Sequence, residues 1–309
     1  MQTYYYPASG ALKAERGLSL ALGFFDGVHL GHRKIIEAAV KEGKKNGLIP
    51  AVFTFPSESE KIKSGAGRLY STADKLSLFE SLGVEITVVC DFSAVSSLSP
   101  KEFVEEVLLG RLNARAVFCG YNYRFGKSAA GNADTLCTLL GDRATLTVFE
   151  EMRFGDEELS TTKIKEALAA GNTELAAEML GEEYFVTSTV ERGLGIGKKS
   201  GFPTINCALP EGCPLPYGVY KTRVRIDNES FIGLTNVGEC PTFGKRAPHI
   251  ETKLLGVDRD LYGKMTKTSF VRYLRPEMTF SGAEELRKQI EKDERDALAD
   301  EFAGEFAGK

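Results

Sequence analysis

The chain has 309 residues, of which 42% are hydrophobic and 27% are charged, so two domains can each bury a core. Its formal net charge of −4 excludes the basic excess on which non-specific nucleic-acid binding depends. No apolar run reaches the length of a membrane span, and the first residues carry no signal-peptide pattern. We therefore expect a cytoplasmic protein without nucleic-acid or membrane partners.

The cysteines are scattered along the chain without any CxxC pair. Most of them lie in apolar, strand-like segments, where a cysteine usually serves as a small core residue. This usage predicts reduced thiols, without a disulfide framework or a zinc site. The six positions are Cys90, Cys119, Cys137, Cys207, Cys213 and Cys240.

The first 181 residues alternate strand-like and helix-like segments. Continuous apolar runs predict buried strands at 18–25, 50–55, 84–90, 114–119 and 145–149. Apolar residues at helical spacing predict helices at 30–45 and 73–81, and Ser99 followed by Pro100 predicts the start of another. Such alternation is typical of a parallel sheet flanked by helices.

From residue 182 onward the pattern changes to short segments of alternating polar and apolar residues, separated by Gly, Pro and Asn. This pattern predicts a compact antiparallel barrel. Its expected strands are 184–191, 218–226, 231–237 and 265–273, and a helix at about 282–302 ends the chain. We therefore expect two domains, residues 1–181 and 182–309.

The segment GFFDGVHLGH, from Gly23 to His32, follows the first of these strands directly. His29 and His32 are three residues apart at a helix start, so both imidazoles can face one ligand. A helix N-terminus attracts phosphate, and imidazoles there can stabilise charge that develops on a phosphoryl oxygen. Glycines allow close approach of the backbone. They are Gly23, Gly27 and Gly31. The segment therefore predicts phosphate chemistry, with a structural histidine pair or a metal site including Asp26 as alternatives.

Two later segments also suit phosphate. The hydroxyl groups of residues 160–162, followed by Lys163 and Lys165, match phosphate oxygens, although a helix N-cap with solvated lysines has the same sequence. Glycines at alternate positions, followed by lysines, can wrap phosphates with backbone N–H groups, although barrel hairpins use the same residues. These residues are Gly193, Gly195, Gly197 and Lys198, and Pro203-Thr204-Ile205-Asn206 follows shortly after them.

These motifs together resemble the prokaryotic bifunctional riboflavin kinase/FAD synthetases. GFFDGVHLGH resembles the HxGH motif of nucleotidylyltransferases, and GYNYRFG at 120–126 resembles the loop that lines the nucleotide and flavin in this family. STTKIK at 160–165 resembles the family's SSTxIR segment, and PTIN at 203–206 resembles the PTAN motif of riboflavin kinases. Ile250-Glu251-Thr252 resembles the segment with the catalytic glutamate. The resemblance runs from about residue 18 to 297.

The resemblance implies an α/β Rossmann-like nucleotidylyltransferase domain, followed by an antiparallel β-barrel riboflavin kinase domain with a terminal helix. The barrel would phosphorylate riboflavin to FMN with MgATP, and the first domain would transfer AMP from a second ATP to FMN, which gives FAD and pyrophosphate. Glu251 would accept the proton of the riboflavin hydroxyl, and His29 and His32 would stabilise the charge of adenylyl transfer. Thr204 and Asn206 would hold Mg²⁺.

The resemblance also assigns binding residues. Nucleotide contacts are expected from Gly23, Phe24, Asp26, Gly27, Gly31, Asn122, Ser160, Thr161, Thr162, Lys165, Gly193, Gly195, Gly197 and Lys198. Flavin contacts are expected from Phe55, Phe125, Arg275 and Glu277.

Two departures from the family pattern motivate an alternative function. The chain reads FTFPSE at 53–58, where the family often has Asp-Pro-His-Pro, and Lys165 replaces the last arginine of SSTxIR. The alternative is a riboflavin kinase whose adenylyltransferase activity is weakened or lost. Another HxGH enzyme, such as a pantetheine-phosphate adenylyltransferase, and a catalytically inactive flavin-binding protein are further alternatives. The oligomeric state stays open.

Overall fold

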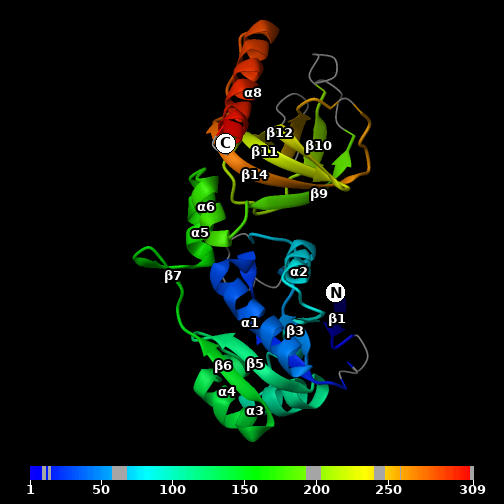
Figure 1. Ribbon diagram of the computed structural model, residues 1–309, viewed down its shortest axis with the longest axis vertical. Helices are drawn as coiled ribbons and strands as arrows, with labels where there is room; N and C mark the ends of the chain where they lie inside the picture. The colour runs from blue at the N-terminus through cyan, green and yellow to red at the C-terminus, as the bar shows by residue number, and fades with distance from the viewer. Residues whose placement is uncertain are drawn as a thin grey trace. The chain divides into compact units, whose positions relative to one another are not determined.

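The computed structural model describes residues 1–8, 12, 15–57, 68–192, 203–239, 248–257 and 259–306 (Figure 1). The chain divides into two compact units, Met1–Thr161 and Thr162–Lys309, and each is described by itself. No described helix combines the length and the apolar character that crossing a bilayer requires.

A six-stranded sheet, in which all neighbouring strands are parallel, forms the centre of the first unit. Its strands are β1 (Gln2–Tyr6), β2 (Leu18–Leu22), β3 (Ile49–Thr54), β4 (Ile86–Cys90), β5 (Ala114–Gly120) and β6 (Thr145–Phe149), in the order β1-β4-β3-β2-β5-β6. The predicted parallel sheet is confirmed. Among the six strands of this sheet, β1 is the one that the sequence does not predict, because it is a partly exposed edge strand without a continuous apolar run.

Helices cover both faces of this sheet. They are α1 (Leu30–Asn46), α2 (Thr72–Ser81), α3 (Pro100–Glu102), the π-helix η4 (Phe103–Arg111), α4 (Ala133–Leu140) and the short 3₁₀ helices η1 (Asp26–Val28), η3 (Phe92–Ala94), η5 (Lys127–Ala129) and η6 (Gly141–Arg143). A short hairpin follows β6, and its two antiparallel strands, β7 (Arg153–Phe154) and β8 (Glu157–Glu158), have two residues each. Ser99 caps α3 with Pro100 at the first helical position, as predicted, and Glu102 completes a capping box with it. Gly47 ends α1 with a φ of 68°.

The central strand β2 shows why a continuous apolar run predicts a strand here. Its leucines belong to a core shared with η4 and α4, whereas the Ser19 hydroxyl on the other face donates to the Ala39 carbonyl of α1 at 2.7 Å. Because both faces are covered, all of its residues are buried. The sequence predicts that this strand runs to Phe25, but it ends at Leu22. Phe25 takes a left-handed conformation with a φ of 54°, so the extended backbone does not reach it.

The second unit is a closed six-stranded antiparallel barrel with helices around it (Figure 1). The strands are β9 (Phe185–Glu191), β10 (Ile205–Ala208), β11 (Gly218–Ile226), β12 (Glu229–Gly238), β13 (His249–Leu254) and β14 (Met265–Arg275), in the order β10-β13-β12-β11-β14-β9. α5 (Thr161–Ala169) and α6 (Thr173–Leu180) precede the barrel, and α8 (Ala283–Phe306) follows it. The predicted barrel and terminal helix are confirmed.

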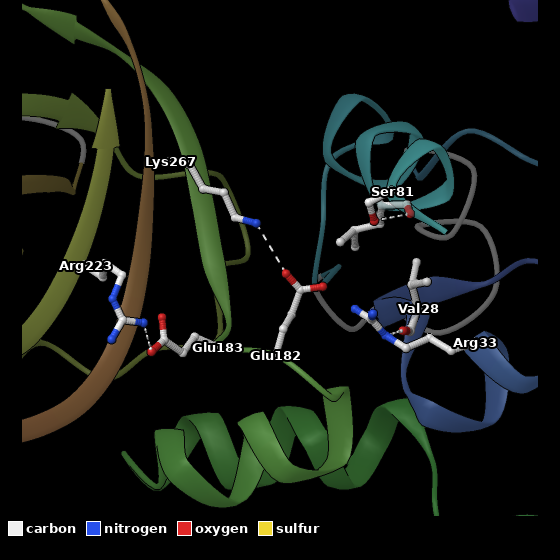
Figure 2. A network of polar contacts seen from close by, with 8 residues as sticks. Val28, Arg33, Ser81, Glu182, Glu183, Arg223 and Lys267 are labelled. Carbon is white, nitrogen blue, oxygen red and sulfur yellow. Dashed lines mark hydrogen bonds and ion pairs between the residues drawn. The ribbon is translucent and has the colours of Figure 1, made fainter. Parts of the chain in front are cut away.

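Hydroxyl groups as well as apolar side chains fill the barrel. The hydroxyl group of Thr235 lies 2.7 Å from that of Thr222 and 2.8 Å from that of Thr252, and all three residues are nearly fully buried. Outside the barrel, Glu182 pairs with Lys267 at 3.3 Å and Glu183 pairs with Arg223, so the chain entering β9 is held to β14 and β11 (Figure 2).

The described cysteines include three that lie in the cores of the two units, namely Cys90, Cys119 and Cys207. Burial raises the pKa of Cys90 to about 12 and that of Cys119 to about 11, so both remain protonated thiols at neutral pH. Their interpretation as core residues is confirmed. Cys137 is exposed on α4, and Cys240 lies outside the described residues.

Candidate active sites

The two histidines of the GFFDGVHLGH segment lie in direct contact at the start of α1. His29 is the residue before the helix, with an extended conformation, and His32 lies in the first turn. Their rings stack with centroids 3.7 Å apart and an interplanar angle of 21°. The two imidazoles are therefore adjacent, as their spacing predicts, and that both face one ligand stays a prediction.

A left-handed turn between β2 and α1 brings the histidines into this position. Phe25, Gly27 and Val28 have φ values of 54°, 80° and 42°. The buried ring of Phe25 contacts the His32 ring edge-on, with centroids 5.3 Å apart. A Cβ atom on Gly23 would lie 2.7 Å from this phenyl ring. Gly23 is thus needed to make room for a phenyl ring of the turn itself, a reason that the sequence does not reveal.

Burial keeps both imidazoles neutral. It lowers the pKa of His29 to about 4, although the nearby Asp26 carboxylate raises it in part. Burial lowers the pKa of His32 well below its usual value, and the neighbouring His29 and Lys75 lower it further, against a hydrogen bond to the Asp26 main chain. Among the described residues, the buried Nδ1 atoms of both histidines have no hydrogen-bond partner. Unpartnered buried nitrogens are unusual, and they suit a ligand that supplies the missing partners.

The lowered pKa of His29 predicts that acid destabilises the first unit. Since the pKa is about 4 in the folded protein and 6.5 for an ordinary histidine, the unfolded chain binds more protons between these limits, and stability falls as the pH drops through this range. From pH 7 to pH 5 this single group should lower the free energy of unfolding by about 2 kcal/mol. Urea denaturation at the two pH values measures the loss. His29→Asn should reduce this loss, and an unchanged loss in His29→Asn would contradict the expectation.

The second predicted phosphate segment meets the first at Asp26. The hydroxyl group of Thr161 donates to the Asp26 carbonyl at 3.0 Å, although the two residues are 135 positions apart. The Asp26 carboxylate also accepts from the backbone N–H of Leu69 at 3.3 Å. Ser160 immediately precedes α5, and Thr162 and Lys165 follow on that helix, within the second unit.

The predicted flavin residues of the first unit differ in exposure. Phe55 is partly buried and stacks on Phe24, with ring centroids 6.0 Å apart. Phe125 is only 6% exposed and packs into the core against Phe103 and Tyr123, so little of its ring is available to a ligand. Asn122, in the same loop as Phe125, is exposed.

Lys75 on α2 also lies close to the histidines, and the motifs do not reveal it. It is 1% exposed, and its Nζ donates to the backbone carbonyls of Phe24 and Phe55 at 3.0 and 2.8 Å. One signal in the sequence points to it, because Lys75 shares a helix face with the apolar Leu78 and Phe79. In the turn itself, Arg33 Nε donates to the Val28 carbonyl at 3.0 Å (Figure 2).

The barrel brings the predicted kinase residues together at β10 and β13. The hydroxyl group of Thr204 donates to Glu251 Oε1 at 2.7 Å. Asn206 on β10 and Asn236 on β12 are both directly paired with Glu251, so the three side chains project from the same face of neighbouring strands. Glu251 and both asparagines are partly exposed. The side chains of this group all carry oxygen atoms, which are the ligands that Mg²⁺ prefers.

Arg275 and Glu277 occupy different environments. Arg275 forms a bidentate ion pair with the buried Asp293 of α8, in which Nε donates to Oδ1 at 3.1 Å and Nη2 donates to Oδ2 at 2.7 Å, and this pair ties the end of β14 to the terminal helix. Glu277 accepts from the Asn236 side chain at 3.5 Å, which places it next to the residue paired with Glu251. The predicted residues Gly193, Gly195, Gly197 and Lys198 lie outside the described part of the chain.

Family models match both halves of the chain. A model described as FAD synthetase matches residues 11–163, and one described as riboflavin kinase matches residues 180–300. Since both models match, the alternative of a kinase without the adenylyltransferase gains no support. A solved structure described as a macrolide-efflux protein from Streptococcus pneumoniae has a TM-score of 0.81 at 24% identity, over 96% of this chain and 98% of that one. This likeness concerns the fold alone.

Curated relatives match the chain over nearly its whole length. A bifunctional riboflavin kinase/FMN adenylyltransferase of Bacillus subtilis is 35% identical over 93% of this chain and 94% of its own. Proteins with the same name from Listeria monocytogenes and Escherichia coli are 34% and 30% identical, over 91% and 94% of both chains. With this coverage, and with both family models in the expected order, the chain belongs to the bifunctional riboflavin kinase/FMN adenylyltransferase family.

Proposed function

We propose that the two reactions of this family take place at the two sites described above, one in each half of the chain. As a member of the family, the protein phosphorylates riboflavin to FMN with ATP and adenylylates FMN to FAD. We assign the adenylylation to residues 1–181 and the phosphorylation to residues 182–309. The stacked pair of neutral imidazoles, each with a buried Nδ1 atom, supports the first assignment most directly.

In adenylyl transfer, a phosphate oxygen of FMN attacks the α-phosphorus of ATP, and the bond from this phosphorus to the pyrophosphate oxygen breaks. Negative charge grows on the phosphoryl oxygens and on the leaving pyrophosphate. Neutral imidazole N–H groups of His29 and His32 donate hydrogen bonds to this charge, next to the positive end of α1. Because they are already positioned and desolvated, they need little reorganisation during the reaction.

In the kinase reaction, Glu251 accepts the proton of the riboflavin 5′-hydroxyl as its oxygen attacks the γ-phosphorus of ATP and ADP leaves. The hydrogen bond from Thr204 fixes the orientation of the Glu251 carboxylate. We propose that Thr204 and Asn206 hold Mg²⁺, which neutralises phosphate charge when bound. The hydroxyl oxygen of Thr204 keeps its lone pairs for this role, since it acts as the donor toward Glu251.

The remaining residues form the binding surfaces in this proposal. At the first site the nucleotide would contact Gly23, Phe24, Asp26, Gly27, Gly31, Asn122, Ser160, Thr161, Thr162 and Lys165, and at the second site it would contact Gly193, Gly195, Gly197 and Lys198. The flavin would contact Phe55 and Phe125 at the first site, where Phe55 offers the more accessible ring, and Arg275 and Glu277 at the second. We further propose a cytoplasmic enzyme that acts on small molecules alone.

Supplying the purified protein with FMN and ATP tests the full proposal. With Mg²⁺ present, FAD and pyrophosphate should form in equal amounts, and riboflavin should yield FMN first and FAD later. Removal of Mg²⁺ with EDTA should stop FMN formation. If riboflavin is phosphorylated but supplied FMN never yields FAD, the assignment of the first site is wrong.

A further inference from the structure

Lys75 is a buried cation that none of the proposed catalytic steps uses. Burying an ammonium group is costly unless hydrogen bonds replace its water. Its Nζ donates to the carbonyls of Phe24 and Phe55, which follow β2 and β3 in the chain. The lysine therefore joins the carboxyl ends of two neighbouring parallel strands, at the edge of the sheet where the segment leading to His29 begins.

Two donors from different elements meet at the Phe24 carbonyl. Besides Lys75 from α2, the buried hydroxyl group of Thr54 donates to it at 2.8 Å. The peptide that they hold leads into Phe25, the first residue of the left-handed turn. A rotation of this peptide would change the φ of Phe25 and with it the position of the ring that packs against His32.

The same helix supports the turn a second time. Phe79 lies one helical turn after Lys75, and its ring contacts Phe25 edge-on with centroids 6.0 Å apart. On one face of α2, therefore, a lysine fixes the backbone before the turn and a phenylalanine fixes the ring within it. Since the phenyl ring lies between Phe79 and His32, these contacts link α2 to the imidazole pair.

We propose that Lys75 is a positioning residue of the adenylyltransferase site, which holds the Phe24 and Phe55 carbonyls so that Phe25 keeps His32 stacked on His29. The inference rests on the proposed role of the two histidines. Lys75 does not react with the substrate; it determines the geometry of the groups that do. Its positive charge also opposes protonation of His32, after the larger effects of burial and of His29.

Lys75→Met tests this role, because methionine has a similar length but neither charge nor donors. The variant should lower kcat for FAD formation from FMN at least about tenfold, the loss expected for hydrogen bonds from a charged group, with the KM for ATP nearly unchanged. Riboflavin phosphorylation by the same chain serves as an internal reference and should stay unchanged. Lys45→Met, at an exposed position near the end of α1, is the matched control and should leave both activities unchanged.

Histidine NMR separates positioning from a general loss of stability. Besides burial, the groups that shift the pKa of His32 are His29, Lys75 and the Asp26 main chain. Loss of the Lys75 charge removes one of the effects that lower the pKa of His32, so its ring signals should titrate at a higher pH in Lys75→Met. A folded Lys75→Met protein with the wild-type kcat and the wild-type histidine titration would overturn the inference.

Thr54→Val keeps the inference testable if Lys75→Met does not fold. It removes only the second donor to the Phe24 carbonyl and should lower kcat for FAD formation in the same direction, by a few-fold. A folded Thr54→Val protein with unchanged kcat would contradict the importance of this carbonyl. His32→Leu is measured alongside. If His32→Leu still forms FAD at the wild-type rate, the proposed role of His32 is wrong. If His32→Leu is inactive but the Lys75 and Thr54 variants keep the wild-type rate, the role of His32 stands and the inference about Lys75 is wrong.

Discussion

Glu251→Gln is expected to abolish the conversion of riboflavin to FMN, while FAD still forms from supplied FMN at the wild-type rate. Glutamine keeps the shape of the side chain and an oxygen that can accept from Thr204, so the local geometry is retained. It cannot accept the proton of the attacking hydroxyl. Loss of a general base of this kind lowers a rate by about 10²–10⁴-fold. Chromatography of the flavins, with riboflavin or FMN as the starting material, measures both reactions.

Glu229→Gln provides the matched control for this substitution. Glu229 lies exposed at the start of β12 in the same barrel, where it pairs with Arg259. Surface ion pairs contribute little to stability, so neither reaction should change by more than about twofold. If Glu251→Gln also stopped FAD formation from FMN in a folded protein, the two reactions would not use separate sites. If riboflavin were still phosphorylated at the wild-type rate, Glu251 would not be the base.

Most of the fold follows from simple patterns in the sequence. Buried parallel strands carry apolar side chains on both faces, so β2 stands out as a continuous run. Strands at an edge or of very short length lack this signal. β1 is partly exposed, and β10 has four residues, so neither produces a pattern that separates it from a loop. The threonines inside the barrel weaken the alternation there further.

The candidate sites were predictable where one short segment carries the chemistry, and less so where the fold assembles it. The histidine pair follows from its spacing at a helix start. The contact of Thr161 with Asp26 depends on tertiary structure and has no local signal. Arg275 also has a structural partner that the resemblance does not predict, because its guanidinium is paired with Asp293 of the terminal helix. Lys75 has only a weak signal, a cation on an apolar helix face.

His29→Leu and His32→Leu are each expected to lower kcat for FAD formation by about 10²–10³-fold, the usual effect of losing one preorganised donor to developing charge. Riboflavin phosphorylation should continue unchanged in both variants. The double variant should lose little more than either single one. Because the two rings stack at 3.7 Å, removal of one leaves the other without its support, so the effects do not add.

Asparagine at the same positions shows which ring nitrogen contributes. Its amide group occupies the region of the imidazole Nδ1, the buried atom that has no partner among the described residues. If Nδ1 faces the phosphates, His29→Asn and His32→Asn should recover part of the activity that the leucine variants lose. Glutamine, which reaches toward Nε2 instead, should recover less. Equal activity of the asparagine and leucine variants would assign the contact to Nε2, and wild-type kcat in a leucine variant would remove that histidine from the mechanism.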